Sequence, residues 1–193
     1  MFTGIVSAVG VVIETDPSRI GINHAATARR LKRGSSIAVN GCCLTVVKKS
    51  GHAFFADIVP ETLRRTNLGA LKVGSRVNLE LPTAANGLLD GHLVQGHVDA
   101  HATVKRVKQA AAGKEVEIGL PRDLGRLVAE KGSIAVDGVS LTVAAVDDAK
   151  GTFSVALIPH TLAATIAHEY KPGSSVNLEI DVIARYVARN LHR

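Results

Sequence analysis

The sequence predicts a mainly β chain that carries two copies of one small domain. The first observation is a twelve-residue stretch at positions 36–47, which returns at 133–144 with eight identical residues in the 193-residue chain. The second is a series of short segments rich in β-branched residues, separated by Gly, Asn and Lys-Ser-Gly turns. Many short strands at regular spacing indicate a small barrel or sandwich.

The repeat extends beyond this stretch. Residues 3–8 align with 95–100, residues 60–63 with 159–162, and residues 74–80 with 173–179, in the same order. The offset grows from 92 to 97 to 99, which loop insertions of five and two residues explain. This pattern indicates a tandem duplication of a whole domain. We expect an N-terminal domain over 1–87, a C-terminal domain over 88–180, and a final segment over 181–193.

The predicted strands recur in both halves. In the first half they cover residues 4–13, 36–39, 44–47, 53–58 and 76–81. In the second half they cover residues 93–105, 115–120, 133–136, 141–146, 152–157 and 175–180.

Helices are few. Pro121 is a good first residue for a predicted helix over 122–131, and Pro60 and Pro159 open predicted single turns. The final segment over 181–193 has helical periodicity, with apolar residues on one side and arginines on the other. Its apolar stripe packs on its own domain or against another subunit, and the sequence leaves both alternatives open.

The net charge of +6 and the pI of about 9.6 permit an acidic partner such as nucleic acid. The basic residues are scattered, however, and the one dense run is Arg29, Arg30, Lys32 and Arg33. Trp is absent, and Tyr and Phe total only six residues, so stacking platforms for bases are scarce. We expect a solvated basic face and no nucleic-acid binding, with a nucleic-acid-binding β-barrel as the remote alternative.

The sequence shows neither a membrane-spanning segment nor a signal peptide. No apolar run approaches the length of a bilayer span, and residues 1–6 lack the features of a signal peptide. Cys42 and Cys43 are adjacent, which is a strained geometry for a disulfide, so both thiols suit a reducing compartment. We expect a cytoplasmic protein without membrane contact.

Standard cofactor and metal motifs are missing. There is no Gly-x-Gly-x-x-Gly turn, no Walker loop and no Gly-x-Ser-x-Gly elbow. His92 and His97 are five residues apart, and no Cys or His cluster has the spacing of zinc ligands. We therefore expect neither a metal nor a cofactor.

The candidate catalytic residues are defined by their positions in the repeat. Cys43 and Ser140 occupy the same place in the two copies, and Thr45 and Thr142 follow two residues later, on the same face of a strand. For each residue alone, a structural role is the commoner one. His97, which replaces Ile5 of the first copy, has a side chain suited to proton transfer near neutral pH.

The final candidate is Asp181. It comes two residues after the second copy of the duplicated Val-Asn-Leu-Glu sequence, which ends at Glu179. The structural alternative for Asp181 is a simple N-cap of the last helix.

Five ordered motifs resemble the riboflavin synthase family, of the alpha-chain type with two lumazine-binding repeats. They lie at residues 1–6, 40–46, 91–99, 137–143 and 181–187, so that the resemblance covers the whole chain. It implies two six-stranded Greek-key barrels and a C-terminal helix that assembles a homotrimer. It also implies an active site between the N-barrel of one subunit and the C-barrel of another, and possible association with lumazine synthase.

The resemblance further implies a transferase reaction. Two molecules of 6,7-dimethyl-8-ribityllumazine in one active site would exchange a four-carbon unit and give riboflavin and 5-amino-6-ribitylaminouracil. Cys43, Thr45 and His97 would act in one pocket and Ser140 in the other, with Asp181 reaching in from a neighbouring subunit. We expect His97 to assist proton transfer at the C7 methyl, and Ser140 or water to add at C7.

Further residues are implied as contacts to the rings and ribityl chains. They are Gly4, Ile5, Val6, Cys43, Leu44, Thr45, Asp57, Ile58, Val59, Pro60, Glu61, Thr62, Gly96, His97, Val98, Lys131, Ser140, Leu141, Thr142, Leu157, Ile158, Pro159, His160, Thr161 and Leu162.

The main rival function has the same fold. Lumazine proteins are light-emission antennae that resemble the synthase and bind ligand without turning it over. They are altered in the second repeat and lose the histidine of the Gly-His motif. Because this chain has Gly96, His97, Ser140 and Asp181, the resemblance favours the enzyme.

Overall fold

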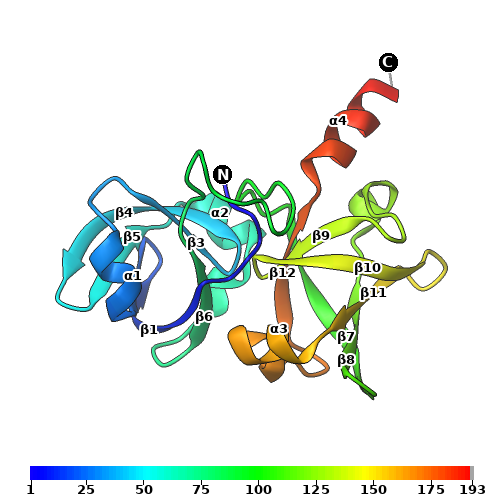
Figure 1. The fold of residues 1–193 in the computed structure, drawn as a ribbon, viewed down its shortest axis with the longest axis horizontal. Helices are drawn as coiled ribbons and strands as arrows, with labels where there is room; N and C mark the ends of the chain where they lie inside the picture. The colour runs from blue at the N-terminus through cyan, green and yellow to red at the C-terminus, as the bar shows by residue number, and fades with distance from the viewer. Residues whose placement is uncertain (192–193) are drawn as a thin grey trace.

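The computed structural model describes residues 1–191 and contains two closed six-stranded β-barrels that lie side by side (Figure 1). The N-barrel consists of β1 (Ala8–Asp16), β2 (Arg19–Asn23), β3 (Ser36–Val39), β4 (Cys42–Ser50), β5 (Ala53–Asp57) and β6 (Arg76–Glu80). The C-barrel consists of β7 (Ala100–Ala110), β8 (Gly113–Gly119), β9 (Ser133–Val136), β10 (Val139–Asp147), β11 (Thr152–Leu157) and β12 (Ser175–Ile180).

Both barrels have the same topology. Around the N-barrel the strand order is β1-β2-β5-β4-β3-β6, and the C-barrel repeats it with β7 to β12 in the corresponding places. All strand pairs are antiparallel, and the connection from β2 to β3 passes over the β4–β5 pair as in a Greek key. The predicted duplicated, mainly β Greek-key fold is confirmed.

The duplicated stretch that first revealed the repeat forms a β-hairpin in each barrel. Asn40 and Gly41 turn the β3–β4 hairpin with φ angles of 44° and 75°, and Asp137 and Gly138 turn β9–β10 with 44° and 76°. Such turns need a residue that tolerates positive φ, which explains Asn-Gly and Asp-Gly at these places. The two turns meet back to back: a Cβ added at Gly41 would lie 2.6 Å from the Gly138 nitrogen.

The two barrels are joined by buried amide side chains that obey the internal symmetry. Asn78 Nδ2 donates to the Asp137 carbonyl at 2.9 Å, and its counterpart Asn177 Nδ2 donates to the Asn40 carbonyl at 2.8 Å. Each barrel thus satisfies a backbone carbonyl in the other barrel's hairpin turn. Because buried polar groups are costly without partners, these bonds fix how the barrels are placed.

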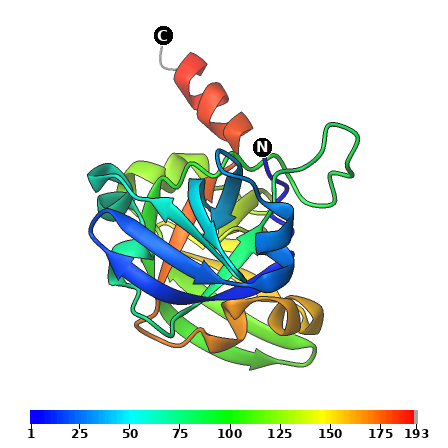
Figure 2. The ribbon, with the colours of Figure 1, turned by 90° about the vertical axis from the view of Figure 1, so that its left-hand side faces the viewer.

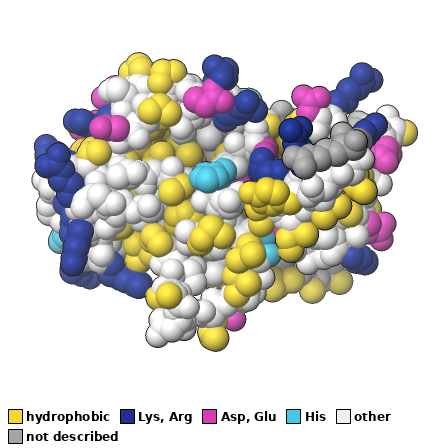
Figure 3. All heavy atoms as spheres, turned by 90° about the horizontal axis from the view of Figure 1, so that it is seen from above, with side chains coloured by type: hydrophobic (Ala, Val, Ile, Leu, Met, Phe, Trp, Pro, Cys, Tyr) yellow, Lys and Arg dark blue, Asp and Glu magenta, His cyan; other side chains and the backbone are white. Residues whose placement is uncertain are grey.

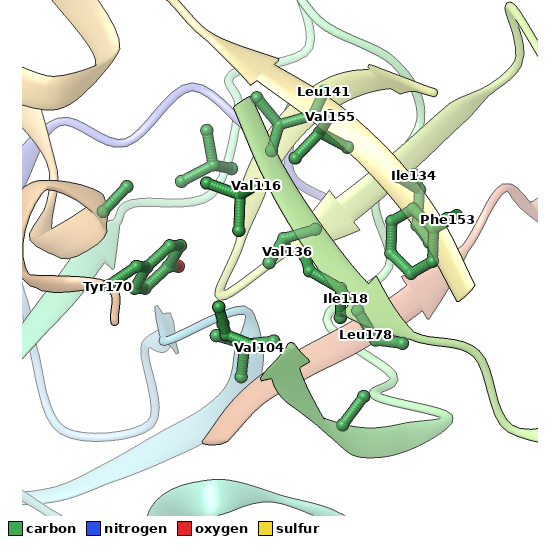
Figure 4. Packing of buried hydrophobic residues seen from close by; sticks show 14 of the residues in the cluster. Val104, Val116, Ile118, Ile134, Val136, Leu141, Phe153, Val155, Tyr170 and Leu178 are labelled. Carbon is green, nitrogen blue, oxygen red and sulfur yellow. The ribbon is translucent and has the colours of Figure 1, made fainter. Parts of the chain in front are cut away.

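Each barrel is filled by alternate side chains of its strands, as Figure 4 shows for the C-barrel around Phe153, Ile118 and Leu178. On β4, Cys42, Leu44 and Val46 are buried, whereas Cys43 is half-buried and Thr45 exposed. β10 has the same pattern. The prediction that Cys43 and Thr45 share a face is therefore confirmed, and that face is the outside of the barrel.

Short helices connect the strands. They are α1 (Ala25–Arg30), α2 (Pro60–Arg65), η1 (Asn67–Ala70), η2 (Arg122–Leu127), α3 (Pro159–Ala164) and η3 (Ile166–Glu169), where η marks a 3₁₀ helix. The helical turns predicted to begin at Pro60 and Pro159 are confirmed as α2 and α3.

Several predicted boundaries are wrong. The helix predicted over 122–131 is only the 3₁₀ helix η2, because the chain turns extended at Val128 and left-handed at Lys131. The strands predicted from residues 4 and 93 begin at Ala8 and Ala100, since the residues before them cross between the barrels. β2 and α1 escaped prediction, because five or six residues are too few to show a period.

The last helix, α4 (Val182–Leu191), projects from the body of the molecule (Figures 1 and 2). Its apolar residues Ile183, Tyr186, Val187 and Leu191 are between 52% and 78% exposed. Within residues 1–191, then, this stripe does not pack on its own domain, and that alternative is wrong. The predicted helix extended to Arg193, and its last two residues lie outside the described part. No helix among the described residues is long and apolar enough to span a membrane.

Candidate active site

The segments that precede the two barrels cross each other. Phe2 and Val94 form an isolated antiparallel bridge, with Phe2 N donating to Val94 O at 2.7 Å and Val94 N to Phe2 O at 3.1 Å. Phe2, Val94, Ala38 and Ala135 form a small apolar cluster between the barrels. Each crossing segment is thereby held against the barrel of the opposite half.

One glycine in each crossing segment lies directly on a predicted catalytic residue. Ser140 N donates to Gly4 O at 2.8 Å, and Cys43 N donates to Gly96 O at 2.9 Å. A Cβ on Gly4 would lie 2.6 Å from Ser140 Cβ, and a Cβ on Gly96 would lie 2.5 Å from Cys43 Cβ. The φ angles of these glycines, 75° and 82°, are also left-handed. Glycine is required at both places by space and by conformation.

A buried carboxylate holds each glycine in place. Glu80 on β6 accepts bonds from Thr3 N at 2.7 Å and Gly4 N at 3.1 Å, and Glu179 on β12 accepts from Gln95 N at 2.6 Å and Gly96 N at 2.9 Å. Burial raises the pKa of both glutamates, and these amide bonds oppose the rise. The crossing segments are therefore fixed to their own barrels while they contact the other.

A cavity of about 360 Å³ lies over Cys43, and we name it the N-barrel cavity. Of the predicted site residues, Cys43, Glu61, Thr62, Gly96, His97 and Val98 line it. The His97 side chain is exposed at its wall. Burial raises the pKa of the neighbouring Cys42 thiol to about 12, so Cys42 acts as a packing residue. Among the described residues, none of the ligand contacts predicted between Lys131 and Leu162 lines this cavity.

The first turns of α4 contribute an unpredicted residue to the N-barrel cavity. Arg185 lines it and makes two contacts with the half-buried Asp99, at 2.9 Å and 3.0 Å. The Asp99 carboxylate also accepts from Ile180 N at 2.9 Å. The start of α4 is therefore tied to the strand that follows His97. A sequence pattern could not show this pair, because its members are 86 residues apart.

Ser140 in the C-barrel has a histidine neighbour that was also not predicted as a site residue. The Nδ1 atom of His92 lies 2.7 Å from Ser140 Oγ, and His92 is buried. Asp181, at the start of α4, acts on His92 through its charge and also accepts a bond from Ile183 N at 2.9 Å. Asp181 thus has the helix-capping position that its sequence context suggested. We name Ser140, His92, Gly4 and Asp181 the C-barrel site.

The remaining predicted residues differ in exposure, and Leu44, Ile58, Leu141 and Leu157 have their side chains buried in the two barrel cores. Thr62 and Thr161 occupy equivalent positions on α2 and α3 and are half-buried. Ile5 and Ile158 are 47% and 56% exposed, as befits residues that would cover a ring. Asp57 differs, because its carboxylate pairs with Arg19 at 3.1 Å on the surface.

Together these features describe two related places on one chain. Each has a backbone strand edge, a small polar side chain on the outer face of a barrel, and a glycine pressed against it. Peptide groups on such strands can bind the edge of a flat heterocycle. A histidine lies beside each place, His97 in the N-barrel cavity and His92 beside Ser140. Among the described residues, no group of three or more Cys, His, Asp or Glu side chains is arranged to hold a metal ion.

The lumazine-binding domain model matches the chain twice, over residues 3–82 and 95–181. The fold and the site thus define a lumazine-binding-domain protein with both copies present. Curated riboflavin synthases are similar over nearly their full length. The Mycobacterium bovis protein is 45% identical (98% of this chain, 97% of that protein), the Actinobacillus pleuropneumoniae protein 42% (99% and 90%) and the Bacillus subtilis protein 40% (100% and 91%). The chain belongs to the riboflavin synthase family, which is a family of enzymes.

Solved structures agree in fold. Crystal structures of LumP with riboflavin and with 6,7-dimethyl-8-(1′-D-ribityl)lumazine superpose with TM-scores of 0.85 and 0.83, at 29% and 28% identity. Each comparison covers 93% of this chain and 99% of LumP. The duplicated barrels therefore occur in proteins that bind lumazine and flavin.

Proposed function

We propose that the protein forms riboflavin and 5-amino-6-ribitylaminouracil from two molecules of 6,7-dimethyl-8-ribityllumazine. The observation that carries this proposal is the paired arrangement of Gly96 on Cys43 and Gly4 on Ser140. Two related sites with different central side chains suit a reaction in which one substrate molecule gives a four-carbon unit and an identical molecule accepts it. The identity to curated riboflavin synthases supports the same reaction.

The roles of the site residues follow from their chemistry. A lumazine in the N-barrel cavity would lie beside His97, which would take a proton from the acidic C7 methyl. A second lumazine in the C-barrel site would receive Ser140, or water, at C7. Well-oriented groups can reach effective molarities of ~10⁵ M or more, so holding two flat rings together supplies much of the acceleration.

Other predicted contacts complete each place in this proposal. Thr62 and Thr161 would bind ribityl hydroxyls, and Cys43 and Thr45 would line the ring site on the outer face of β4. Lys131, His160 and the residues beside α2 and α3 would contact the ligand at the rim.

The active site is proposed to form between subunits. The N-barrel cavity of one chain is lined by none of the described contacts predicted between Lys131 and Leu162, and this supports a site that a C-barrel of another chain would complete. The apolar stripe of α4 provides a surface for that association, and hydrophobic side chains gather on the face from which α4 projects (Figure 3). We infer a homotrimer. Binding to lumazine synthase and a cytoplasmic location stay predictions.

The reaction is tested with purified protein, the lumazine and a chelator. We expect riboflavin fluorescence to appear without added metal or cofactor, with two lumazines consumed for each flavin. Tight lumazine binding without flavin formation would contradict the proposal and favour an antenna role. Salt-sensitive oligonucleotide binding without lumazine binding would favour the nucleic-acid alternative.

The composite site is tested by mixing two inactive variants. His97→Gln damages the N-barrel cavity, and Ser140→Ala damages the C-barrel site. After subunit exchange, an intact N-barrel of one variant can meet an intact C-barrel of the other, so activity should return. Activity that stays absent in mixed trimers would place the whole site within one chain.

Assembly is tested by light scattering. Wild-type protein should have about three times the chain mass of 20.2 kDa. Ile183→Asp places a charge on the exposed apolar stripe and should give monomers that form little flavin. Arg189→Ser, on the same helix, is the matched control and should stay trimeric. A monomeric wild type would contradict the inferred assembly.

A further inference from the structure

The interface between the barrels contains a cavity that neither predicted site uses. It has a volume of about 620 Å³ and lies between the β1–β2 turn, the chain from α2 to η1, and the starts of β7 and β12. We name it the interface cavity. Its lining shares only Thr66 with the N-barrel cavity. It is therefore a separate place, and its volume lies in the range of small-molecule sites in proteins.

The internal symmetry defines an equivalent place in the other half of the interface. Asn67 N at the start of η1 donates to Asn177 Oδ1 on β12 at 2.6 Å, and Ile166 N at the start of η3 donates to Asn78 Oδ1 on β6 at 2.9 Å. Both pairs of positions are related by the offset of 99 residues found in the sequence. Since η1 lies on β12 as η3 lies on β6, the residues around the two places can be compared position by position.

In the half that contains η3, large side chains occupy the equivalent place. Arg76 Nη1 on β6 donates to Glu169 Oε1 at 2.8 Å and lies 3.1 Å from His168 Nε2. Lys114 Nζ donates to the His168 carbonyl at 3.0 Å. A guanidinium group between a carboxylate and an imidazole thus bridges η3 and β6.

The interface cavity is open because its corresponding side chains are small. Gly69 and Ala70 take the two positions on η1 that the histidine and the glutamate take on η3, and Ser175 takes the position of the arginine on β12. None of these three side chains is large enough to bridge η1 and β12. A molecule that fits the cavity would gain the packing contacts that the ion pair makes in the other half.

The lining of the interface cavity has a single charged group. Among the described residues that line it, Asp16 is the one Asp, Glu, Lys or Arg. Ser18 N and Ser18 Oγ each lie 2.7 Å from Asp16 Oδ1, and these bonds lower the pKa of Asp16, so that it is a carboxylate at neutral pH. Within residues 1–191 Asp16 has no ion-pair partner, and the neighbouring Arg19 pairs with Asp57 at 3.1 Å. An unpaired carboxylate favours a cationic ligand.

Hydrogen-bonding and apolar side chains complete the lining. His101 on β7 and Ser175 on β12 face the cavity, with His101 Nδ1 3.4 Å from Ser175 Oγ. Leu63 on α2 and Leu71 after η1 supply an apolar wall. A carboxylate, an imidazole and an apolar wall together match a flat organic cation with an apolar part.

We propose that the interface cavity binds a small organic cation of the guanidinium or amidinium class, with its charge on Asp16 and its apolar part against Leu63 and Leu71. The bound cation takes the place that the Arg76 side chain has in the other half. This inference goes beyond the proposed function, because it requires neither lumazine binding nor flavin formation.

The test is an NMR titration of the full-length protein with benzamidine, a flat amidinium on an apolar ring. We expect the amide signals of Gly69 and Ala70 to shift with a dissociation constant on the order of 1 mM, as befits a ligand of this size. Benzyl alcohol has a similar shape without the charge, and it should bind at least about tenfold more weakly.

The charge is tested with Asp16→Asn, which should weaken benzamidine binding at least about tenfold. The matched control is Asp147→Asn. Asp147 ends β10 as Asp16 ends β1, but its carboxylate pairs with Lys150 at 2.6 Å. The control should bind benzamidine as the wild-type protein does.

The cavity itself is tested by building the missing ion pair. Ala70→Glu combined with Ser175→Arg gives the interface cavity the carboxylate and the guanidinium of the other half. Both positions are exposed, so the fold should persist, as urea unfolding would show. Benzamidine binding should be lost, because the new side chains fill the space.

Four results would overturn the inference. They are no shift of the Gly69 and Ala70 amides at benzamidine concentrations well above the expected constant, equal affinity for benzyl alcohol, wild-type affinity in Asp16→Asn, and unchanged binding in the folded double variant. None of these measurements uses lumazine. A wild-type protein that forms no flavin would overturn the proposed function alone, so the two failures are distinguishable.

Discussion

The two barrels keep one framework and differ at a few side chains. In both, a carboxylate on the last strand holds the amide of a crossing glycine, and that glycine's carbonyl accepts a bond from a residue of the other barrel. The residue is Cys43 in one barrel and Ser140 in the other. Ser140 has His92 beside it, whereas Cys43 has an open cavity. Duplication thus preserved the backbone geometry and left the chemistry free to diverge.

The interface between the barrels also combines equivalent backbone positions with different side chains. Asn40 and Asp137 occupy equivalent turns, but only Asp137 accepts three buried bonds, from Asn67 Nδ2 at 2.9 Å, Tyr170 OH at 2.8 Å and Asn177 N at 2.8 Å. Among the described residues, Asn40 Oδ1 accepts one bond, from Asn78 N on β6 at 2.8 Å. One ionisable group therefore replaces an amide in an otherwise symmetric contact.

The largest expected effect comes from breaking the shared framework. Gly96→Ala would force a left-handed alanine and press its Cβ on Cys43, so we expect a loss of about 3–4 kcal/mol of unfolding free energy. Gly4→Ala should cost the same. Gly74 also has positive φ, at 93°, but nothing lies within 4 Å of an added Cβ. Gly74→Ala should therefore cost only about 1–2 kcal/mol in urea unfolding. Equal losses would contradict the close-contact argument.

The next effect is a dependence of stability on pH, which Asp137 should cause and its counterpart Asn40 cannot. Burial raises the pKa of Asp137 from 3.8 to about 6. The unfolded chain then ionises first as pH rises, so the folded state loses about 3 kcal/mol in total between about pH 3 and pH 7. Asp137→Asn should remove this loss, measured as urea unfolding free energy against pH. Exposed Asp148→Asn is the control and should keep it; the same pH slope in both variants would contradict the prediction.

A smaller effect is expected from making the crossing segments alike. His97→Ile gives the second copy the residue that the first has at Ile5. We expect kcat for flavin formation to fall by ~10²-fold, because the proton-transfer group is lost, while lumazine binding persists. Ile5→Val, in the other segment, should retain activity. An unchanged kcat for His97→Ile would remove His97 from the chemistry.

The smallest effect concerns the helix that has no counterpart in the first half. Arg185→Gln removes the pair with Asp99 and should lower the unfolding free energy by about 1 kcal/mol, since Arg185 is partly exposed. High salt should reduce the difference from wild type. Arg189→Gln on the same helix should have no comparable effect, and equal losses in both variants would contradict a specific role for the pair.

The sequence was informative wherever the signal was local or written twice. The β3–β4 and β9–β10 hairpins, the turns at Pro60 and Pro159, and the shared face of Cys43 and Thr45 follow from turn chemistry and strand alternation. The boundaries of β1 and β7 did not follow, because residues 4–7 and 93–99 have strand-like composition but cross between barrels. Nothing local distinguishes a residue that pairs within a sheet from one whose amide binds a distant glutamate.

His92 and Arg185 show the limit most clearly. The sequence by itself determined the fold, the duplication and the places where the two copies differ, because periodicity, turn residues and repeated motifs act over short distances along the chain. Only the tertiary structure decided that His92 meets Ser140 and that Arg185 meets Asp99, which lie 48 and 86 residues apart. Such contacts depend on how closed barrels bring remote segments together, and no spacing along the chain encodes that distance.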